Sequence, residues 1–134
     1  MPSSAPTRAY FMFPRPEPPR HVYHHAMVVL AEGLAELGVP IHSNIDYWRP
    51  GPGEPYLLKH DPDVRPEDCQ ILVLDYLWPV HHPQLPAQVL RLDRNHLAVM
   101  LDWTDGHETH CFKPPFRAFD LIFRPPRPED FARP

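Results

Sequence analysis

The chain has 134 residues, of which 43% are hydrophobic and 22% are charged. These proportions are typical of one globular domain spanning residues 1–134 and exclude a wholly disordered chain. A net charge of −4 argues against nucleic acids and membrane surfaces as partners, because both attract basic proteins.

The expected location is the cytoplasm. No apolar stretch approaches the roughly 20 residues of a membrane span, and residues 1–7 lack the basic start and apolar core of a signal peptide. Cys69 and Cys111 lack the spacing of a disulfide framework or a redox motif.

Prolines are the outlier, since the 21 prolines are about three times the usual number. They cluster between the apolar runs of the sequence. This position indicates that the prolines restrict the shape of loops and do not interrupt helices or strands. Residues 1–7 are expected to be flexible, and residues 125–134 form a proline-rich tail.

The first half of the chain predicts a strand, a helix and a second strand. An aromatic strand at residues 8–13 precedes a helix at residues 21–37, which Gly38 ends. A strand at 40–45 follows, with a small extra strand at 56–60. Apolar residues recur at helical spacing along the predicted helix, at Val22, Ala26, Val29, Leu30, Gly33, Leu34 and Leu37.

The second half predicts three more strands, at residues 70–74, 96–101 and 119–123, with a polar turn at 61–68 and a short helix at 83–92. Continuous apolar runs of this length are typical of strands buried on both faces. The alternation of strands with crossovers predicts an α/β fold: an open, mostly parallel, doubly wound (Rossmann-like) sheet in three layers.

Polar and aromatic residues follow the predicted strands. Ligands of open α/β sheets bind beyond the carboxyl ends of the strands, so these residues are candidates for a site. Asp75 also stands at a strand end, and Tyr47 and Trp48 lie in the loop after the second strand. The substrate-binding candidates are Arg15, Asn44, Asp46, Trp78, Trp103 and Arg124. The alternative is that these residue types suit turns, solvated surface or the cover of a core.

Three histidines stand at the start of the first helix: His21, His24 and His25. The helix dipole disfavours the charged imidazole there, so one of them is a candidate general base. Asp102 and Asp105 are candidates for orienting an acceptor hydroxyl. The alternatives are a solvated helix start and an aspartate-stabilised turn.

His107, His110 and Cys111 contain the donor atoms that zinc uses, which admits a small metal-dependent hydrolase as a third hypothesis. No complete zinc motif is present, so we expect no metal. The glycine fingerprints of dinucleotide and phosphate-binding loops are absent, as is the nucleophile elbow of serine hydrolases, and no cofactor is expected.

The segment AMVVLAEGLAELGVP at 26–40 resembles the first helix and second strand of the N-terminal domain of GT-B-fold glycosyltransferases. The strand-end pieces LD at 74–75, LDWTDG at 101–106 and FDLIFR at 119–124 support the resemblance. It implies that this domain holds the acceptor, and that a second domain holds the nucleotide sugar. Inverting members often place a basic histidine at the start of this helix, where His21, His24 and His25 stand.

The chain departs from that family in its proline-rich first loop, which replaces a glycine-rich one, and in having no donor-binding half. The leading hypothesis is therefore a glycosyltransferase-like domain that binds a sugar or another small acceptor at the carboxyl edge of the sheet. A nucleotide sugar would require a second domain or a partner. The alternative is a non-catalytic Rossmann-like interaction module that binds another protein or forms a homodimer.

Overall fold

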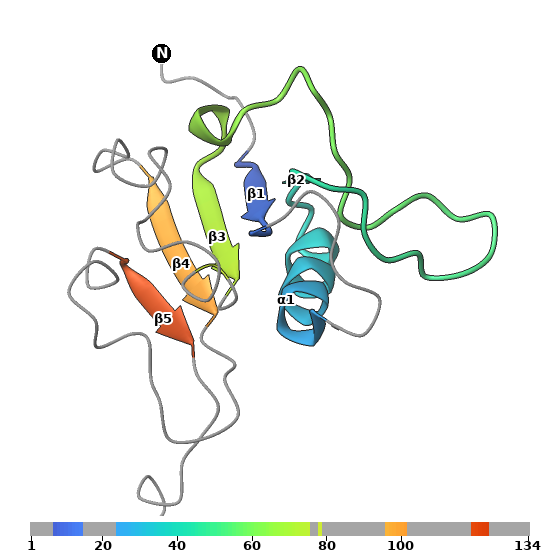
Figure 1. Cartoon of the computed structure of the whole chain (residues 1–134), viewed down its shortest axis with the longest axis horizontal. Coiled ribbons are helices and arrows are strands. Elements are labelled where there is room, and N and C mark those ends of the chain that lie inside the picture. Colours follow the sequence, from blue (N-terminus) through green and yellow to red (C-terminus); the bar gives the residue numbers. More distant parts are fainter. Residues whose placement is uncertain (1–6, 15–23, 76–77, 79–95, 102–118, 124–134) are drawn as a thin grey trace, which may run out of the picture.

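The computed structural model describes residues 7–14, 24–75, 78, 96–101 and 119–123 (Figure 1). They form one open sheet in which all neighbouring strands are parallel, in the order β2-β1-β3-β4-β5. This confirms the predicted α/β fold. The elements are β1 (Ala9–Met12), α1 (His25–Glu36), β2 (Ile41–Ser43), the 3₁₀ turn η1 (Pro66–Asp68), β3 (Ile71–Asp75), β4 (Leu97–Leu101) and β5 (Leu121–Phe123).

Strands that follow one another in the sequence are added to opposite sides of the sheet, and the change of side falls between β1 and β3. We call this change the reversal of strand order. From β1 the chain crosses through α1 to β2 on one side, whereas β3 leads to β4 and β5 on the other. Met12 pairs with Leu74, so the chain leaves β1 at Phe13 beside the last residue of β3, Asp75. A reversal of this kind is where open α/β sheets form a ligand-binding crevice.

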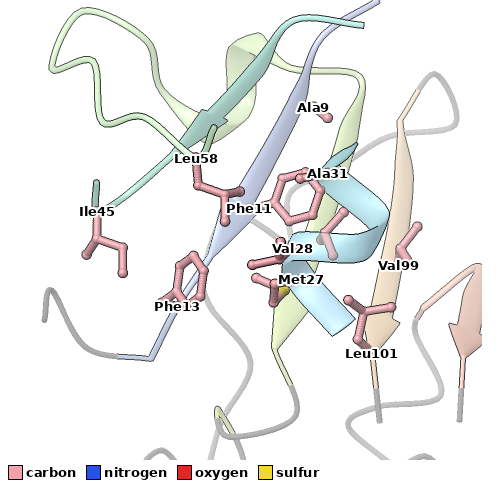
Figure 2. Packing of buried hydrophobic residues seen from close by; sticks show 11 residues of the cluster. Ala9, Phe11, Phe13, Met27, Val28, Ala31, Ile45, Leu58, Val99 and Leu101 are labelled. Carbon is pink, nitrogen blue, oxygen red and sulfur yellow. The ribbon is translucent and has the colours of Figure 1, made fainter. Parts of the chain in front are cut away.

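One face of the sheet packs against α1. Phe11 and Phe13 meet Met27, Val28 and Ala31 of the helix, and Figure 2 shows these side chains between the sheet and α1. The alternation of strand side chains sends a second set to the opposite face. That second cluster contains Tyr10, Met12, Cys69, Leu72, Leu74, Ala98, Met100 and Phe119.

The buried face of α1 differs from the predicted stripe. Met27, Val28 and Ala31 are its buried residues, whereas Val29 and Leu37 of the predicted stripe are 52% and 80% exposed. All residues from 26 to 31 are apolar. Helical spacing alone therefore does not determine which side of this helix faces the sheet.

Gly38 ends the helix as predicted. Its φ of +85° is in the left-handed region, and its N–H donates to the Ala35 carbonyl at 2.9 Å. The Val39 N–H donates to the Leu34 carbonyl at 3.0 Å, which completes a Schellman motif.

The extra strand predicted at 56–60 is not a strand. Leu58 forms an isolated antiparallel bridge with Tyr47, and His60 forms a parallel bridge with Ser43. These single bridges hold the loop next to β2 and the residues that follow it, but they do not form the continuous hydrogen-bond ladder of a strand. The predicted helix at 83–92, the segment 1–6 and the proline-rich tail lie outside the described residues, so the third layer stays a prediction.

Candidate functional site

A buried imidazole and a buried carboxylate meet at the reversal of strand order between β1 and β3. His24 immediately precedes α1, Asp75 ends β3, and His24 Nδ1 lies 2.7 Å from Asp75 Oδ2. The two side chains are only 1% and 2% exposed. The two atoms are within ion-pair distance, but among the described residues neither of them has a partner that meets hydrogen-bond geometry. Their proximity to each other is therefore the compensation that the described residues offer these two atoms for the loss of water.

The chemistry of the two groups determines which nitrogen of His24 can carry the hydrogen that faces Asp75. A carboxylate only accepts hydrogen bonds, so a hydrogen bond between the two groups requires the hydrogen on Nδ1 of His24. In the neutral imidazole the lone pair then lies on Nε2, which is the nitrogen able to accept a proton. The same division of roles operates wherever an aspartate orients a catalytic histidine.

The fold brings the two residues together by simple rules. Ile71, Val73 and Asp75 alternate onto the face of the sheet that α1 covers, and the N-terminus of α1 lies at the carboxyl edge of the sheet. The partial positive charge of a helix N-terminus also favours a carboxylate nearby. Asp75 is thus placed next to both the helix end and the imidazole of His24.

Two aromatic rings enclose the imidazole of His24. The Phe13 ring is 4.7 Å away and the Tyr47 ring 5.5 Å away, both nearly perpendicular to it. The Tyr47 hydroxyl also accepts a hydrogen bond from the His24 backbone N–H at 3.3 Å. Residues at or just beyond the carboxyl ends of β1, β2 and β3 therefore converge on one imidazole.

Asn44 ties the loops after β1 and β2 together. Its Oδ1 accepts from the Phe13 N–H at 2.9 Å, and its Nδ2 donates to the Phe13 carbonyl at 2.8 Å. The side-chain amide thereby continues the sheet for one residue. Asp46 is exposed and accepts from the His60 backbone N–H at 2.8 Å. For both residues the structure shows contacts that hold the loops in place, and substrate binding stays a prediction.

The other described candidates lie apart from this pair. His25 is exposed and lines an apolar groove beside α1. Trp78 packs against the cluster on the opposite face of the sheet. The remaining candidates lie outside the described residues: Arg15, His21, Asp102, Trp103, Asp105, Arg124, His107, His110 and Cys111.

Sequence reasoning treated Asp75 only as a polar strand end and missed it as the partner of a histidine. A signal for it was present, because Asp75 directly follows a run of apolar residues that predicts a strand buried on both faces. A carboxylate in that position is buried and needs a partner. Tyr47 was recognised as a loop aromatic, but not as a neighbour of His24.

The described residues with shifted pKa values lie away from the pair. Burial raises the pKa of the Cys69 thiol to about 11, and burial is also the main cause that raises the pKa of Tyr10. Burial lowers the pKa of His42, with the Arg8 charge acting in the same direction. Cys69 and Tyr10 belong to the cluster on the opposite face of the sheet from His24 and Asp75.

Within the part of the chain that the structure describes, no three His, Cys, Asp or Glu residues gather into a metal site. No described helix is both long and apolar enough to cross a membrane. Comparisons with protein-family models, with curated proteins and with solved structures found no match to this chain.

Proposed function

We propose that the chain is a glycosyltransferase-like domain that binds an acceptor hydroxyl at the carboxyl edge of its sheet, with His24 as the general base. The observation that carries the proposal is the buried His24–Asp75 pair at 2.7 Å, next to the reversal of strand order. The sequence resemblance supports it, because it implies a basic histidine at the start of this helix.

The proposed step is a proton transfer coupled to substitution. Nε2 of His24 takes the proton of the acceptor hydroxyl while the oxygen forms a bond to the anomeric carbon of a nucleotide sugar. The bond from that carbon to the nucleotide breaks, and the nucleotide leaves with the bonding electrons. Asp75 keeps hold of the Nδ1 hydrogen and stabilises the imidazolium that forms.

The acceptor half of this proposal is testable on the chain alone. Saturation-transfer NMR with methyl glucoside and methyl mannoside as sugar probes should show binding that His24→Gln and Asp75→Asn abolish. The matched control is His60→Gln, which replaces an exposed histidine on the loop after β2. Binding that is equal in all four proteins would place the sugar elsewhere and contradict the proposal.

The donor half makes a separate prediction. A nucleotide sugar should require a second domain or a partner, so UDP-glucose should give no heat of binding in a calorimetric titration of this chain. Tight binding of UDP-glucose by the chain alone would contradict the proposed division of roles.

A second candidate function, an interaction module, is favoured by the groove beside α1. The groove has a volume of about 450 Å³ and is bounded by α1, Leu101 of β4 and Phe123 of β5. Val29, Leu37 and Phe123 are exposed there by 52%, 80% and 47%. Exposed apolar surface of this kind marks interaction sites.

The partner proposed for this groove is a second copy of the chain. Val29 and Leu37 lie four residues to either side of Gly33, which also lines the groove. A Cβ added at Gly33 would meet no described atom within 4 Å. Two such helices crossing antiparallel at Gly33 would place Val29 of each against Leu37 of the other, as a two-fold interface requires. The small residue at the crossing allows the helices to approach closely.

A further inference from the structure

We infer that Tyr47 is a positioning residue for His24: it holds the imidazole in the orientation that the Asp75 contact requires. This inference rests on the proposed function, in which that imidazole is the base. The first observation is that Tyr47 contacts His24 in two ways. Its hydroxyl accepts the backbone N–H at 3.3 Å, and its ring lies edge to face with the imidazole at 5.5 Å.

The second observation is the backbone that presents Tyr47. The next residue, Trp48, has a φ of +68°, the only positive φ among the described residues other than glycines. A bulky residue rarely adopts this conformation unless its surroundings hold it there. Here the paired backbones of Tyr47 and Leu58 do so, with hydrogen bonds of 2.8 and 3.1 Å.

Leu58 anchors this arrangement in the core. It is fully buried and belongs to the same cluster as Phe13, so the loop end that carries Tyr47 cannot shift without opening that cluster. In Figure 2, Leu58 and Phe13 both lie to the left of helix α1. Leu58 therefore anchors the backbone of Tyr47, whose ring lies 5.5 Å from the imidazole of His24.

The restraint matters because of where His24 stands. It is the residue before α1, with non-helical φ and ψ of −93° and 62°, and its side chain makes no capping hydrogen bond. The helix therefore fixes its backbone only in part. Phe13, Tyr47 and Asp75 supply the remaining restraints on the ring, and Tyr47 is the one that also binds the backbone.

The test uses spectra of the imidazole nitrogens in the full chain, recorded near pH 8, and needs no substrate. In the unmodified protein and in Tyr47→Phe, which keeps the ring, His24 should show one tautomer with the hydrogen on Nδ1. In Tyr47→Leu the two nitrogens should move towards averaged shifts, as for a ring no longer held by Asp75. The matched control is Tyr56→Leu, which removes a tyrosine of the same loop that stacks with Arg49 at 4.2 Å.

A second measurement covers the case in which Tyr47→Leu fails to fold. Tyr47→Phe removes only the acceptor of the His24 N–H, so that amide should exchange with solvent about fivefold faster than in the unmodified protein. A His24 spectrum in Tyr47→Leu that matches the unmodified protein, or unchanged amide exchange in Tyr47→Phe, would overturn the positioning role. Neither result bears on sugar binding, which tests the proposed function separately.

Discussion

At the scale of single residues, the candidate site is distinguished by buried polar side chains. His24, Ser43 and Asp75 are the buried polar or charged side chains of the described residues, and two of the three face each other. A buried pair of this kind contributes little net stability while it is intact. Removing one member is costly, because the other is left buried without a partner.

Replacing Asp75 should therefore destabilise the protein. We expect Asp75→Ala to lower the free energy of unfolding by about 1–3 kcal/mol, since His24 Nδ1 loses its 2.7 Å contact with Asp75 and has no hydrogen bond to another described residue. Urea denaturation followed by circular dichroism would measure the change. The control Asp63→Ala removes an exposed carboxylate and should stay within about 0.5 kcal/mol. Equal effects of the two substitutions would show that the buried contact contributes nothing.

Cys69 should behave as an inert core residue. It is fully buried and its thiol pKa is raised to about 11, so little thiolate exists at neutral pH and none is accessible. In a Cys111→Ser background, we expect DTNB near pH 8 to label Cys69 only after urea is added. Fast labelling of the native protein would contradict its placement in the core.

At the scale of elements, sequence patterns located the strands well and the helix face poorly. The runs at 70–74 and 96–101 match β3 and β4 within a residue, because a strand buried on both faces consists of little else than apolar residues. The pattern of apolar residues does not show which side of α1 faces the sheet, because residues 26–31 are all apolar. The orientation of the helix is instead determined by its contacts with Phe11 and Phe13.

The two glycines of this region should respond in opposite ways to alanine. Gly38→Ala places a Cβ at a φ of +85° and should destabilise the protein by about 1–2 kcal/mol. Gly33→Ala lies inside α1 with open space around it, and should stabilise the dilute protein by about 0.5–1 kcal/mol. Thermal and urea unfolding of both variants would measure the difference. The same sign of change in both would contradict the assigned helix end.

The strand β2 carries a histidine that should make the protein sensitive to acid. Burial, and then the Arg8 charge, lower the pKa of His42, while Asp61 partly opposes them. The unfolded chain, with a histidine pKa of about 6.5, then binds this proton before the native protein does. His42 should therefore have no effect on stability above about pH 7, and should reduce it as the pH falls below about 6.5.

Unfolding free energies measured across this range would test the effect of His42. We expect His42→Gln to lose less stability than the unmodified protein as the pH falls, with His60→Gln as the exposed control. Parallel curves for the unmodified protein and His42→Gln would contradict the expected role of His42.

At the scale of the whole molecule, the topology explains why a candidate site could be predicted from the sequence. Parallel strands in the order β2-β1-β3-β4-β5 place the ends of β1 and β3 side by side at the reversal. The sequence predicted this edge and named His24, because the order of strand, loop and helix is local information. The partnership with Asp75 depends on contacts across 51 positions of the chain, from 24 to 75, and no local pattern encodes it.

The groove beside α1 joins the helix to the ends of β4 and β5, through Leu101 and Phe123. The exposed apolar side chains of Val29, Leu37 and Phe123 are the surface on which the proposed second copy of the chain would pack.

Sedimentation at several concentrations would test this association. We expect a dimer that Leu37→Gln weakens without loss of stability, since Leu37 is 80% exposed in one chain. Lys59→Gln, at a different groove, should leave the dimer unchanged. A monomer at every concentration would contradict the homodimer.

The most direct test of the central claim is the position of the imidazole hydrogen on His24. In a two-bond ¹H–¹⁵N spectrum of the full chain near pH 8, we predict that His24 carries its hydrogen on Nδ1, next to Asp75 Oδ2 at 2.7 Å, with Nε2 unprotonated. A base that accepts a hydroxyl proton needs this tautomer. A hydrogen on Nε2, with Nδ1 unprotonated, would contradict both the pairing with Asp75 and the proposed chemistry.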